Sequence, residues 1–352
     1  MARRVSELDA LRGVMLLWIT ATHLPTVLST YVNQPLGFFA GTEGFIFLSA
    51  LFTGLISIRI VERGGWGAMC RRLWARAGRL YGYHLLLVVV AFILVAPLAA
   101  HGNRPAVRNL LDILPIYIIF LALTPFALVM GSRLGWRYPF AGGITLWLLA
   151  QVGLRSFAYG ILTGDLGLRV PLNEMGAFDL WAWQLWWLLG LWLGVRWARD
   201  DLPLDAWAKR LALPAALVSG SFLMVRYAQL QGLVSLEHSA WLLDKWNLGP
   251  GRIVDFAAVA ALAIRFRSAL KPLALPPFML LGRASLEVFC VHVLCVFSAL
   301  TILGERPVIG GWAAVALVLG SWSAMLATAA VVTRSRRSRA PSSARMPVPA
   351  RA

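Results

Sequence analysis

The first apolar stretch of the sequence carries an arginine and a histidine that could take part in a reaction across a membrane, given their types and spacing. Arg12 and His23 stand eleven positions apart in ELDALRGVMLLWITATHLPTVLSTYVN, which runs from Glu7 to Asn33. In an α-helix this spacing is about three turns, or roughly 16 Å of rise, so both side chains project from one face at different depths. If the helix crosses a bilayer, the imidazole lies inside the apolar slab, where ionisable groups are costly and usually functional. The alternative is that Arg12 only marks the cytoplasmic end and His23 bonds to a neighbouring helix.

A carboxylate is expected at the depth of His23 on the next helix. The first helix should emerge near Tyr31, about 12 Å beyond His23, and the second should re-enter near Gly37, about 9 Å before Glu43. A buried carboxylate beside an imidazole can orient the ring and stabilise its protonated form, as a general base requires. The spacing therefore predicts a dyad of His23 and Glu43, with His23 as the base.

A basic segment follows the second apolar run. In RRLWARAGRLYGYH, Arg76 and Arg79 are three positions apart and share one helical face. Guanidinium groups bind phosphate oxygens in pairs, so this face could hold a phosphorylated ligand. The alternative, given equal weight, is that these arginines only mark the cytoplasmic surface.

A second intramembrane histidine lies in LGRASLEVFCVHVLC. Arg283 and Glu287 are four positions apart and can neutralise each other, while His292 follows inside the apolar run. Two helices that each bury an imidazole predict a shared polar cavity. Arg283 and His292 are therefore candidates for binding the transferred group or its acceptor.

Further polar residues that could bind an extracytoplasmic ligand lie on outer loops and at helix ends. These are Gln184, Glu237, His238, Asp244, Lys245, Asn247 and Arg252. Gln184 belongs to the tryptophan-rich segment FDLWAWQLWW, which is typical of an interfacial belt and whose aromatic faces also suit sugar rings.

Composition identifies the class of protein. The 352 residues are 59% hydrophobic and only 14% charged, with a mean hydropathy of +0.71, which predicts an all-α polytopic membrane protein. The net charge of +17 is spread over short clusters between apolar runs, which excludes a nucleic-acid-binding stripe. The three cysteines have no spacing typical of zinc or of a disulfide framework, and we expect no metal.

Ten apolar runs are long enough to cross a bilayer. They cover residues 9–31, 37–60, 80–100, 110–131, 138–160, 180–198, 211–229, 250–267, 275–301 and 312–333. Basic and basic-poor connections alternate, which predicts cytoplasmic N and C termini. Arg155 and Arg226 fall near outer helix ends, where snorkelling is expected. We expect one membrane domain over residues 1–333 and a disordered basic cytoplasmic tail over residues 334–352.

The sequence resembles a known family of membrane enzymes. The Arg-x10-His pair, GTEGFIFLSA from Gly41, RAGRLYGYH from Arg76 and LGRASLEVFCVH from Leu281 are similar to the acyltransferase 3 superfamily. More narrowly, ELDALRG, FDLWAWQLWWLLG and LDKWNLGPGRIVDF resemble the OpgC branch, the succinyltransferases of osmoregulated periplasmic glucans. The resemblance covers nearly all of residues 5–332. One departure is Gly82, where the superfamily often has a proline.

The resemblance implies a ten-helix enzyme of the bacterial inner membrane. It implies transfer of an acyl group from cytoplasmic acyl-CoA, here succinyl-CoA, to a carbohydrate hydroxyl on the periplasmic side. Carried over by position, the essential arginine and histidine of the family fall on Arg12 and His23, and its basic motif falls on Arg76 and Arg79. Arg12 is thus expected to serve the acyl-CoA phosphates, and Arg283 or Arg252 to pair with the succinyl carboxylate. The alternatives are acylation of another envelope glycan, and transport of an anionic solute without covalent chemistry.

Overall fold

The protein is built from helices. The computed structural model describes residues 6–99, 112–165, 167, 169, 171, 172, 176–303 and 308–338. In this part of the chain the other regular feature is one parallel bridge, between Thr26 and Ile309. The main helices are α1 Ser6–His23, α2 Val27–Val32, α3 Gly41–Ala99, α5 Ile113–Arg133, α6 Arg137–Gln151, α7 Leu154–Gly164, α8 Leu180–Ala198, α9 Leu204–Leu230, α10 Pro250–Arg265, α12 Pro276–Arg283, α13 Ser285–Leu303 and α14 Gly311–Ser338. Short helical turns lie at η2 Glu237–Leu243, α11 Arg267–Leu270 and η3 Lys271–Leu273.

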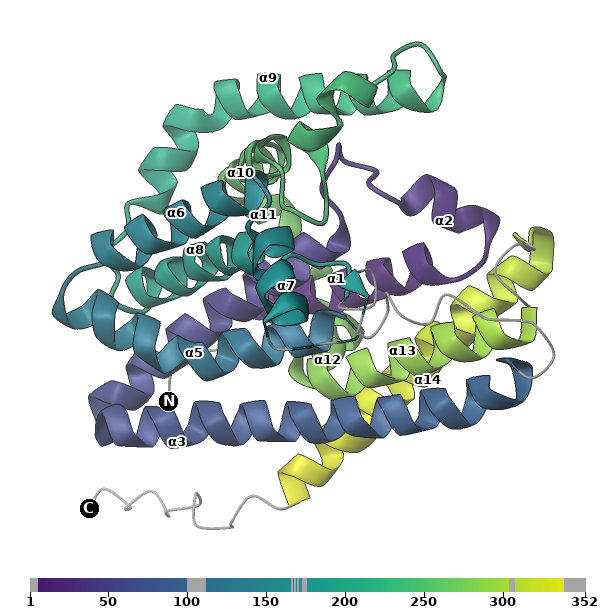
Figure 1. Ribbon diagram of the computed structural model, residues 1–352, viewed down its shortest axis with the longest axis horizontal. Helices are drawn as coiled ribbons and strands as arrows, with labels where there is room; N and C mark the ends of the chain where they lie inside the picture. The colour runs from purple at the N-terminus through teal and green to yellow at the C-terminus, as the bar shows by residue number, and fades with distance from the viewer. Residues whose placement is uncertain are drawn as a thin grey trace, which may run out of the picture.

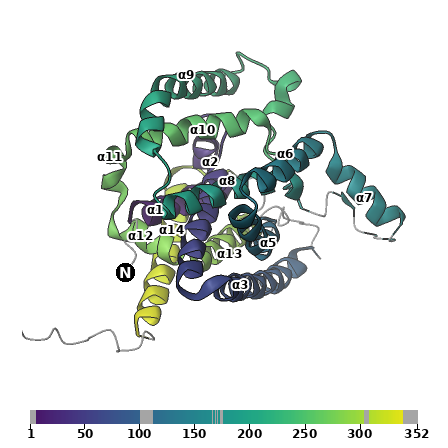
Figure 2. The same cartoon turned by 90° about the vertical axis from the view of Figure 1, so that its left-hand side faces the viewer.

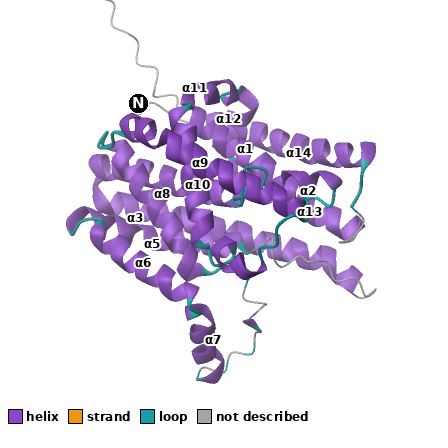
Figure 3. Cartoon of the chain, turned by 90° about the horizontal axis from the view of Figure 1, so that it is seen from above, coloured by secondary structure: helices purple, strands orange, loops and turns teal. Residues whose placement is uncertain are grey.

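Five of these helices are long and apolar enough to span a membrane: α3, α5, α9, α13 and α14. The bent pair α6 and α7, whose axes differ by 79°, makes a sixth if it is one span. The expected α-helical membrane protein is therefore confirmed, whereas ten spans and cytoplasmic termini stay predictions. In Figures 2 and 3 α7 projects away from the other helices.

The second and third predicted spans are the two arms of α3. The connection expected between residues 60 and 80 is helical, except at Gly65, where φ is 73° and ψ is 178°. Only glycine adopts such angles without strain, so this residue turns the helix. In Figure 1 the second arm runs along the lower edge of the molecule. Arg76 and Arg79 thus lie on a helix, as expected, because the arginines, alanines and leucines of this segment favour helix.

Helix α8 packs closely on the first arm of α3 through glycines. A Cβ atom at Gly190 would lie 2.6 Å from the carbonyl oxygen of Phe47, and one at Gly194 would lie 2.0 Å from that of Leu51. A Cβ atom at Gly54 would lie 2.2 Å from the carbonyl oxygen of Leu191 on the facing helix. Small residues at this spacing let membrane helices approach backbone to backbone. This contact fixes the position of the polar residues at the start of α3.

Helix α1 is held in the middle of the molecule. Gly13 lies against the carbonyl of Phe278, and Gly282 lies against that of Asp9, so α1 and α12 approach closely. In Figures 1 and 2 α10 lies between α9 and the central helices, so α9 forms the outer edge. α1 ends at His23, well short of the predicted residue 31, because Pro25 disfavours helical geometry in the residue before it and cannot donate a backbone hydrogen bond.

The last helix extends beyond the predicted end of the membrane domain. α14 continues to Ser338, and its Arg336 donates to Glu287 at 2.6 Å and to the carbonyl of Arg283 at 3.1 Å. The helical part of the chain thus reaches five residues past residue 333. Residues 339–352 of the expected tail lie outside the described residues.

Candidate active site

His23 ends α1 with one ring nitrogen bound. Its Nδ1 lies 2.8 Å from the carbonyl oxygen of Ile19, one turn earlier in the same helix. A carbonyl only accepts, so Nδ1 carries the hydrogen and Nε2 of the neutral ring keeps its lone pair. The half-buried ring is therefore held in the tautomer that a general base needs.

The carboxylate of Glu43 is bound to an arginine. Arg252 of α10 donates from Nε to Oε1 of Glu43 at 2.8 Å, and its Nη2 donates to the same oxygen. Oε2 accepts from the backbone N–H of Ala40 at 3.0 Å. Both side chains are almost completely buried, with 1% of each exposed.

The predicted dyad of His23 and Glu43 is therefore wrong as a direct contact. Among the described residues no hydrogen bond joins the two side chains, because Arg252 and Ala40 hold the carboxylate and Ile19 holds the imidazole. Glu43 lies in the first turn of α3, where its carboxylate fixes Arg252.

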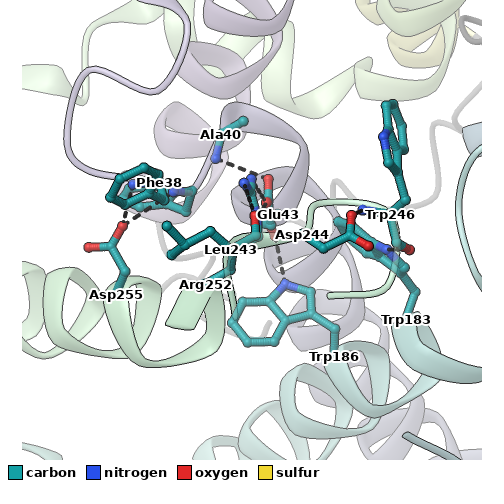
Figure 4. A network of polar contacts seen from close by, with 11 residues as sticks. Phe38, Ala40, Glu43, Trp183, Trp186, Leu243, Asp244, Trp246, Arg252 and Asp255 are labelled. Atoms are coloured by element: carbon teal, nitrogen blue, oxygen red, sulfur yellow. Dashed lines mark hydrogen bonds and ion pairs between the residues drawn. The ribbon is translucent and has the colours of Figure 1, made fainter. Parts of the chain in front are cut away.

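A second carboxylate shapes the chain just before Glu43. Oδ2 of Asp255 accepts from the backbone N–H groups of Phe38 and Phe39 at 2.6 and 3.3 Å. The indole of Trp186 donates to the carbonyl of Glu43 at 3.0 Å. Figure 4 shows Asp255 and Arg252 reaching from α10 to this segment. The start of α3 is thus held on two sides by polar contacts.

His292 of α13 lies beside His23. The ring centroids are 5.6 Å apart, and His292 is only 1% exposed. Its Nδ1 has no hydrogen-bond partner among the described atoms. The structure thus brings together the two intramembrane imidazoles, which come from opposite ends of the sequence.

Lys245 supplies a positive charge near the two histidines. It interacts electrostatically with both His23 and Glu43. Its ammonium lies 5.1 Å from the ring of Trp246 and 5.9 Å from that of Phe178. Burial lowers the pKa of this lysine, and the charge of Glu43 acts in the opposite direction. A cation in this position can meet an anionic group brought to His23.

Two other predicted outer residues shape the loop that carries Lys245. Oδ1 of Asp244 accepts from the backbone N–H of Trp246 at 2.8 Å. The carbonyl of Asn247 accepts from Gln151 at 2.7 Å. These hydrogen bonds of Asp244 and Asn247 fix the backbone that presents the lysine.

Gln184 connects two helices through its side-chain amide. Its Nε2 donates to the carbonyl of Gly143 at 2.7 Å and to that of Trp181 at 3.0 Å. The first bond joins α8 to α6, and the second lies within α8. Acceptor binding by Gln184 stays a prediction.

The opposite end of α1 lines a small cavity with Arg12 and Arg76. Arg12 donates to the hydroxyl of Ser285 and lies 4.9 Å from the ring centroid of Phe52. Arg76 donates to the hydroxyls of Tyr117 at 2.6 Å and of Thr53 at 3.3 Å. The cavity has a volume of about 30 Å³. The helix-one arginine and the basic motif are therefore brought together as the sequence predicts.

Arg79 and Arg283 have different surroundings. Arg79 is exposed on α3 and does not line the cavity. Arg283 pairs with Asp9, with Nε 3.6 Å from Oδ2. Glu287 pairs with Arg336 of α14, at 2.6 Å. The expected pairing of Arg283 with Glu287 is replaced by these two pairs, because the helix breaks at Ala284 between α12 and α13.

A larger cavity lies at the end of α9. Its volume is about 490 Å³. It is lined by Gln34, Phe38, Arg226, Gln229, Val234, Ser235, Leu236, Glu237, Ala240, Leu243 and Arg252. Apart from Arg252 and Glu237, these residues could not be grouped from the sequence, because they come from three separate segments. In the described part of the chain no group of three or more potential metal ligands occurs.

Comparison with known proteins identifies the family. A model described as OpgC protein matches residues 4–110 and 104–337. The chain belongs to the OpgC family. No curated protein and no solved structure matches this OpgC protein. Membership indicates a membrane transferase that modifies glucans with acyl groups, and the resemblance read from the sequence is confirmed at that level.

Proposed function

We propose that this OpgC protein transfers an acyl group from cytoplasmic acyl-CoA to hydroxyls of a periplasmic glucan, and that this acyl group is succinyl. It would do so in the bacterial inner membrane. The observation that carries the proposal is the arrangement of α1, which has Arg12 in a cavity with Arg76 at one end and a correctly held base, His23, at the other. Membership of a glucan-modifying family supports the choice of reaction.

The small cavity lined by Arg12 and Arg76 is the proposed entry site of the donor, acyl-CoA. Arg76 donates to hydroxyls, so among the described residues no carboxylate cancels its charge. Such a guanidinium can release a hydroxyl partner and donate to a phosphate oxygen of CoA in its place. Arg79, exposed on the same helix, is placed to meet phosphates at the surface. The pantetheine arm would then carry the thioester along α1 towards His23.

The reaction proposed at His23 is direct acyl transfer. Nε2 removes the proton of the acceptor hydroxyl as the hydroxyl oxygen attacks the thioester carbonyl. The tetrahedral intermediate collapses, the carbon–sulfur bond breaks, and the CoA thiolate takes up a proton. The products are an acylated glucan and free CoA. His292, beside His23, is placed to share or relay that proton.

The distal carboxylate of a succinyl group requires a cation near the base. Arg252 and Arg283, the candidates from the sequence, are in ion pairs with Glu43 and Asp9. Lys245 interacts with His23 and lies at aromatic rings, with no carboxylate ion pair in the described part of the chain. We assign the carboxylate to Lys245.

The test is acyl transfer by the purified full-length protein in sealed vesicles. Succinyl-CoA is supplied on one side and a glucan on the other, and succinylated glucan is measured by mass spectrometry. The proposal expects product with the intact protein, none with His23→Ala, and reduced preference for succinyl over acetyl with Lys245→Met. Product formed equally by His23→Ala would contradict it.

A further inference from the structure

The cavity beside Arg252, introduced above, is here called the outer cavity. Three segments form its walls: the connection between α2 and α3, the end of α9 with the following loop that includes η2, and the start of α10. At about 490 Å³ it lies within the roughly 300–1,000 Å³ typical of sites for small ligands. It is therefore large enough for more than a bound water or ion.

The charges lining the outer cavity are close to balanced. Arg252 is neutralised by Glu43, beneath the wall of the cavity. The remaining charged groups are one cation, Arg226, and one exposed carboxylate, Glu237. A site for a strongly anionic ligand would show an excess of cations. This balance favours a neutral ligand.

The polar groups of the outer cavity suit hydroxyls. Gln34, Gln229 and Ser235 offer both donors and acceptors, and the carboxylate of Glu237 offers a strong acceptor. Arg226 donates to Gln229 at 3.1 Å and to the carbonyl of Asn33 at 3.3 Å, which orders this wall. Mixed donors and acceptors on one wall match a ligand whose every hydroxyl both donates and accepts.

One wall of the outer cavity also stores backbone strain. Gln34 has a φ of 59°, in the left-handed region that side chains other than glycine, asparagine and aspartate rarely adopt. Such strain concentrates at ligand sites, where the surrounding structure holds it. Phe38, on the same connection, is almost fully buried, and the guanidinium of Arg226 lies over its ring, 6.0 Å from the centroid. This contact helps to hold the planar guanidinium of Arg226 at the cavity wall.

The outer cavity connects to the base through named residues. Arg252 lines the cavity and binds Glu43, and Glu43 interacts with Lys245, which in turn is the charged neighbour of His23. A chain of hydrogen-bonded and charged groups thus links the cavity wall to the residue proposed as the base.

We infer that the outer cavity binds neutral hexose units of the acceptor, next to the hydroxyl that is acylated. The inference rests on the proposed function, because it assigns the acceptor of that reaction to a site. It involves Gln34, Arg226, Gln229, Ser235 and Glu237, of which only Glu237 was singled out from the sequence.

The test compares two glutamines at the end of α9. Gln229 lines the outer cavity, whereas Gln231, two residues later, is exposed and outside it. Binding of a neutral linear gluco-oligosaccharide to full-length Gln229→Ala and Gln231→Ala is measured by calorimetry in detergent. Loss of a hydrogen bond should weaken binding by about threefold to tenfold in Gln229→Ala and leave Gln231→Ala unchanged. Glu237→Gln, which keeps the shape, should weaken binding by a similar factor.

Transfer assays with the same variants separate the two proposals. We expect Gln229→Ala to raise KM for the glucan, with kcat and the dependence on acyl-CoA unchanged. Equal oligosaccharide binding by the two alanine variants would overturn the site, as would binding of succinate but not of the oligosaccharide by the wild type. If both alanine variants transfer acyl groups with the same KM for the acceptor, the saccharide site is refuted and the proposed function stands. Gln229-dependent oligosaccharide binding without any transfer would refute the function and leave the saccharide site.

Discussion

At one end of α1 the guanidinium of Arg76 donates to the hydroxyls of Thr53 and Tyr117, whereas near the other end that of Arg252 donates twice to the carboxylate of Glu43. The first arginine is half-buried beside a cavity, and the second is almost fully buried. Hydroxyls satisfy a guanidinium without cancelling its charge, while a carboxylate cancels it. We propose that the same residue type binds an anion in the first region, whereas in the second it stabilises the structure.

The difference extends to the residues around each arginine. Beside Arg252, the carboxylate of Asp255 accepts from backbone N–H groups, so both acids in this region fix the chain that leads into α3. The imidazoles of His23 and His292 lie beside this fixed frame. A base that must accept a proton from a neutral hydroxyl benefits from such a rigid setting with its charges already paired.

Breaking the ion pair of Glu43 and Arg252 should have the largest effect on stability. Glu43→Gln leaves the charge of Arg252 buried without its partner, which costs about 3–5 kcal/mol. We expect a markedly lower unfolding temperature in detergent and less protein in the membrane. The double variant Glu43→Gln with Arg252→Met removes both charges and should regain much of the loss. A Glu43→Gln protein as stable as the wild type would contradict the structural role of this pair.

Removing the charge of Arg76 should weaken the binding of acyl-CoA and leave the stability of the protein unchanged. Arg76→Met should raise KM for acyl-CoA by about tenfold or more, since a charge-assisted hydrogen bond contributes about 1.5–3 kcal/mol. Arg79→Met, on the exposed face, is the matched control and should have a smaller effect. An equal acyl-CoA dependence in wild type and Arg76→Met would restore the view that these arginines only mark the cytoplasmic surface.

The second outer carboxylate tests whether the entry to α3 needs a charge. Asp255→Asn keeps the shape but replaces a charged acceptor of two backbone N–H groups, and should cost about 1–2 kcal/mol of stability. Thermal unfolding checks this, with Asp244→Asn, in a half-exposed turn, as the control. Similar losses in both variants would show that the buried carboxylate has no special part.

The exposed ion pair of Arg267 and Asp205 marks the lower limit of the comparison. The two side chains are 68% and 60% exposed and lie 3.0 Å apart. Arg267→Gln should change stability by less than about 1 kcal/mol, and the small effect should vanish at high salt. A loss as large as that of Glu43→Gln would mean that burial does not separate these pairs.

Much of the architecture follows from the order of apolar runs. The runs place helices from α1 to α14, and the spacing of Arg12 and His23 correctly predicts that they lie at different levels of one helix. The meeting of Arg12 with Arg76 could also be expected, because both were assigned to the same membrane surface. Depth along a helix is readable from sequence because the rise per residue is fixed.

Partners across the bundle could not be read in this way. Arg252 is 209 residues from Glu43, and no local pattern says which of several cations reaches the carboxylate. The choice depends on how α10 is rotated against α3, which the packing of many side chains decides. The same limit hid the outer cavity, since its walls come from three separate segments. Arg226, expected only to snorkel, orders one of these walls.

The most direct measurement is mass spectrometry of periplasmic glycans from cells with the intact protein, with His23→Ala at equal membrane level, and with no protein. If His23 is the base of the acyl transfer, succinyl groups should be found on a glucan only in the cells with the intact protein. Unchanged modification in His23→Ala cells would contradict the central role of this residue. An acyl mass on another envelope glycan would contradict the proposed acceptor.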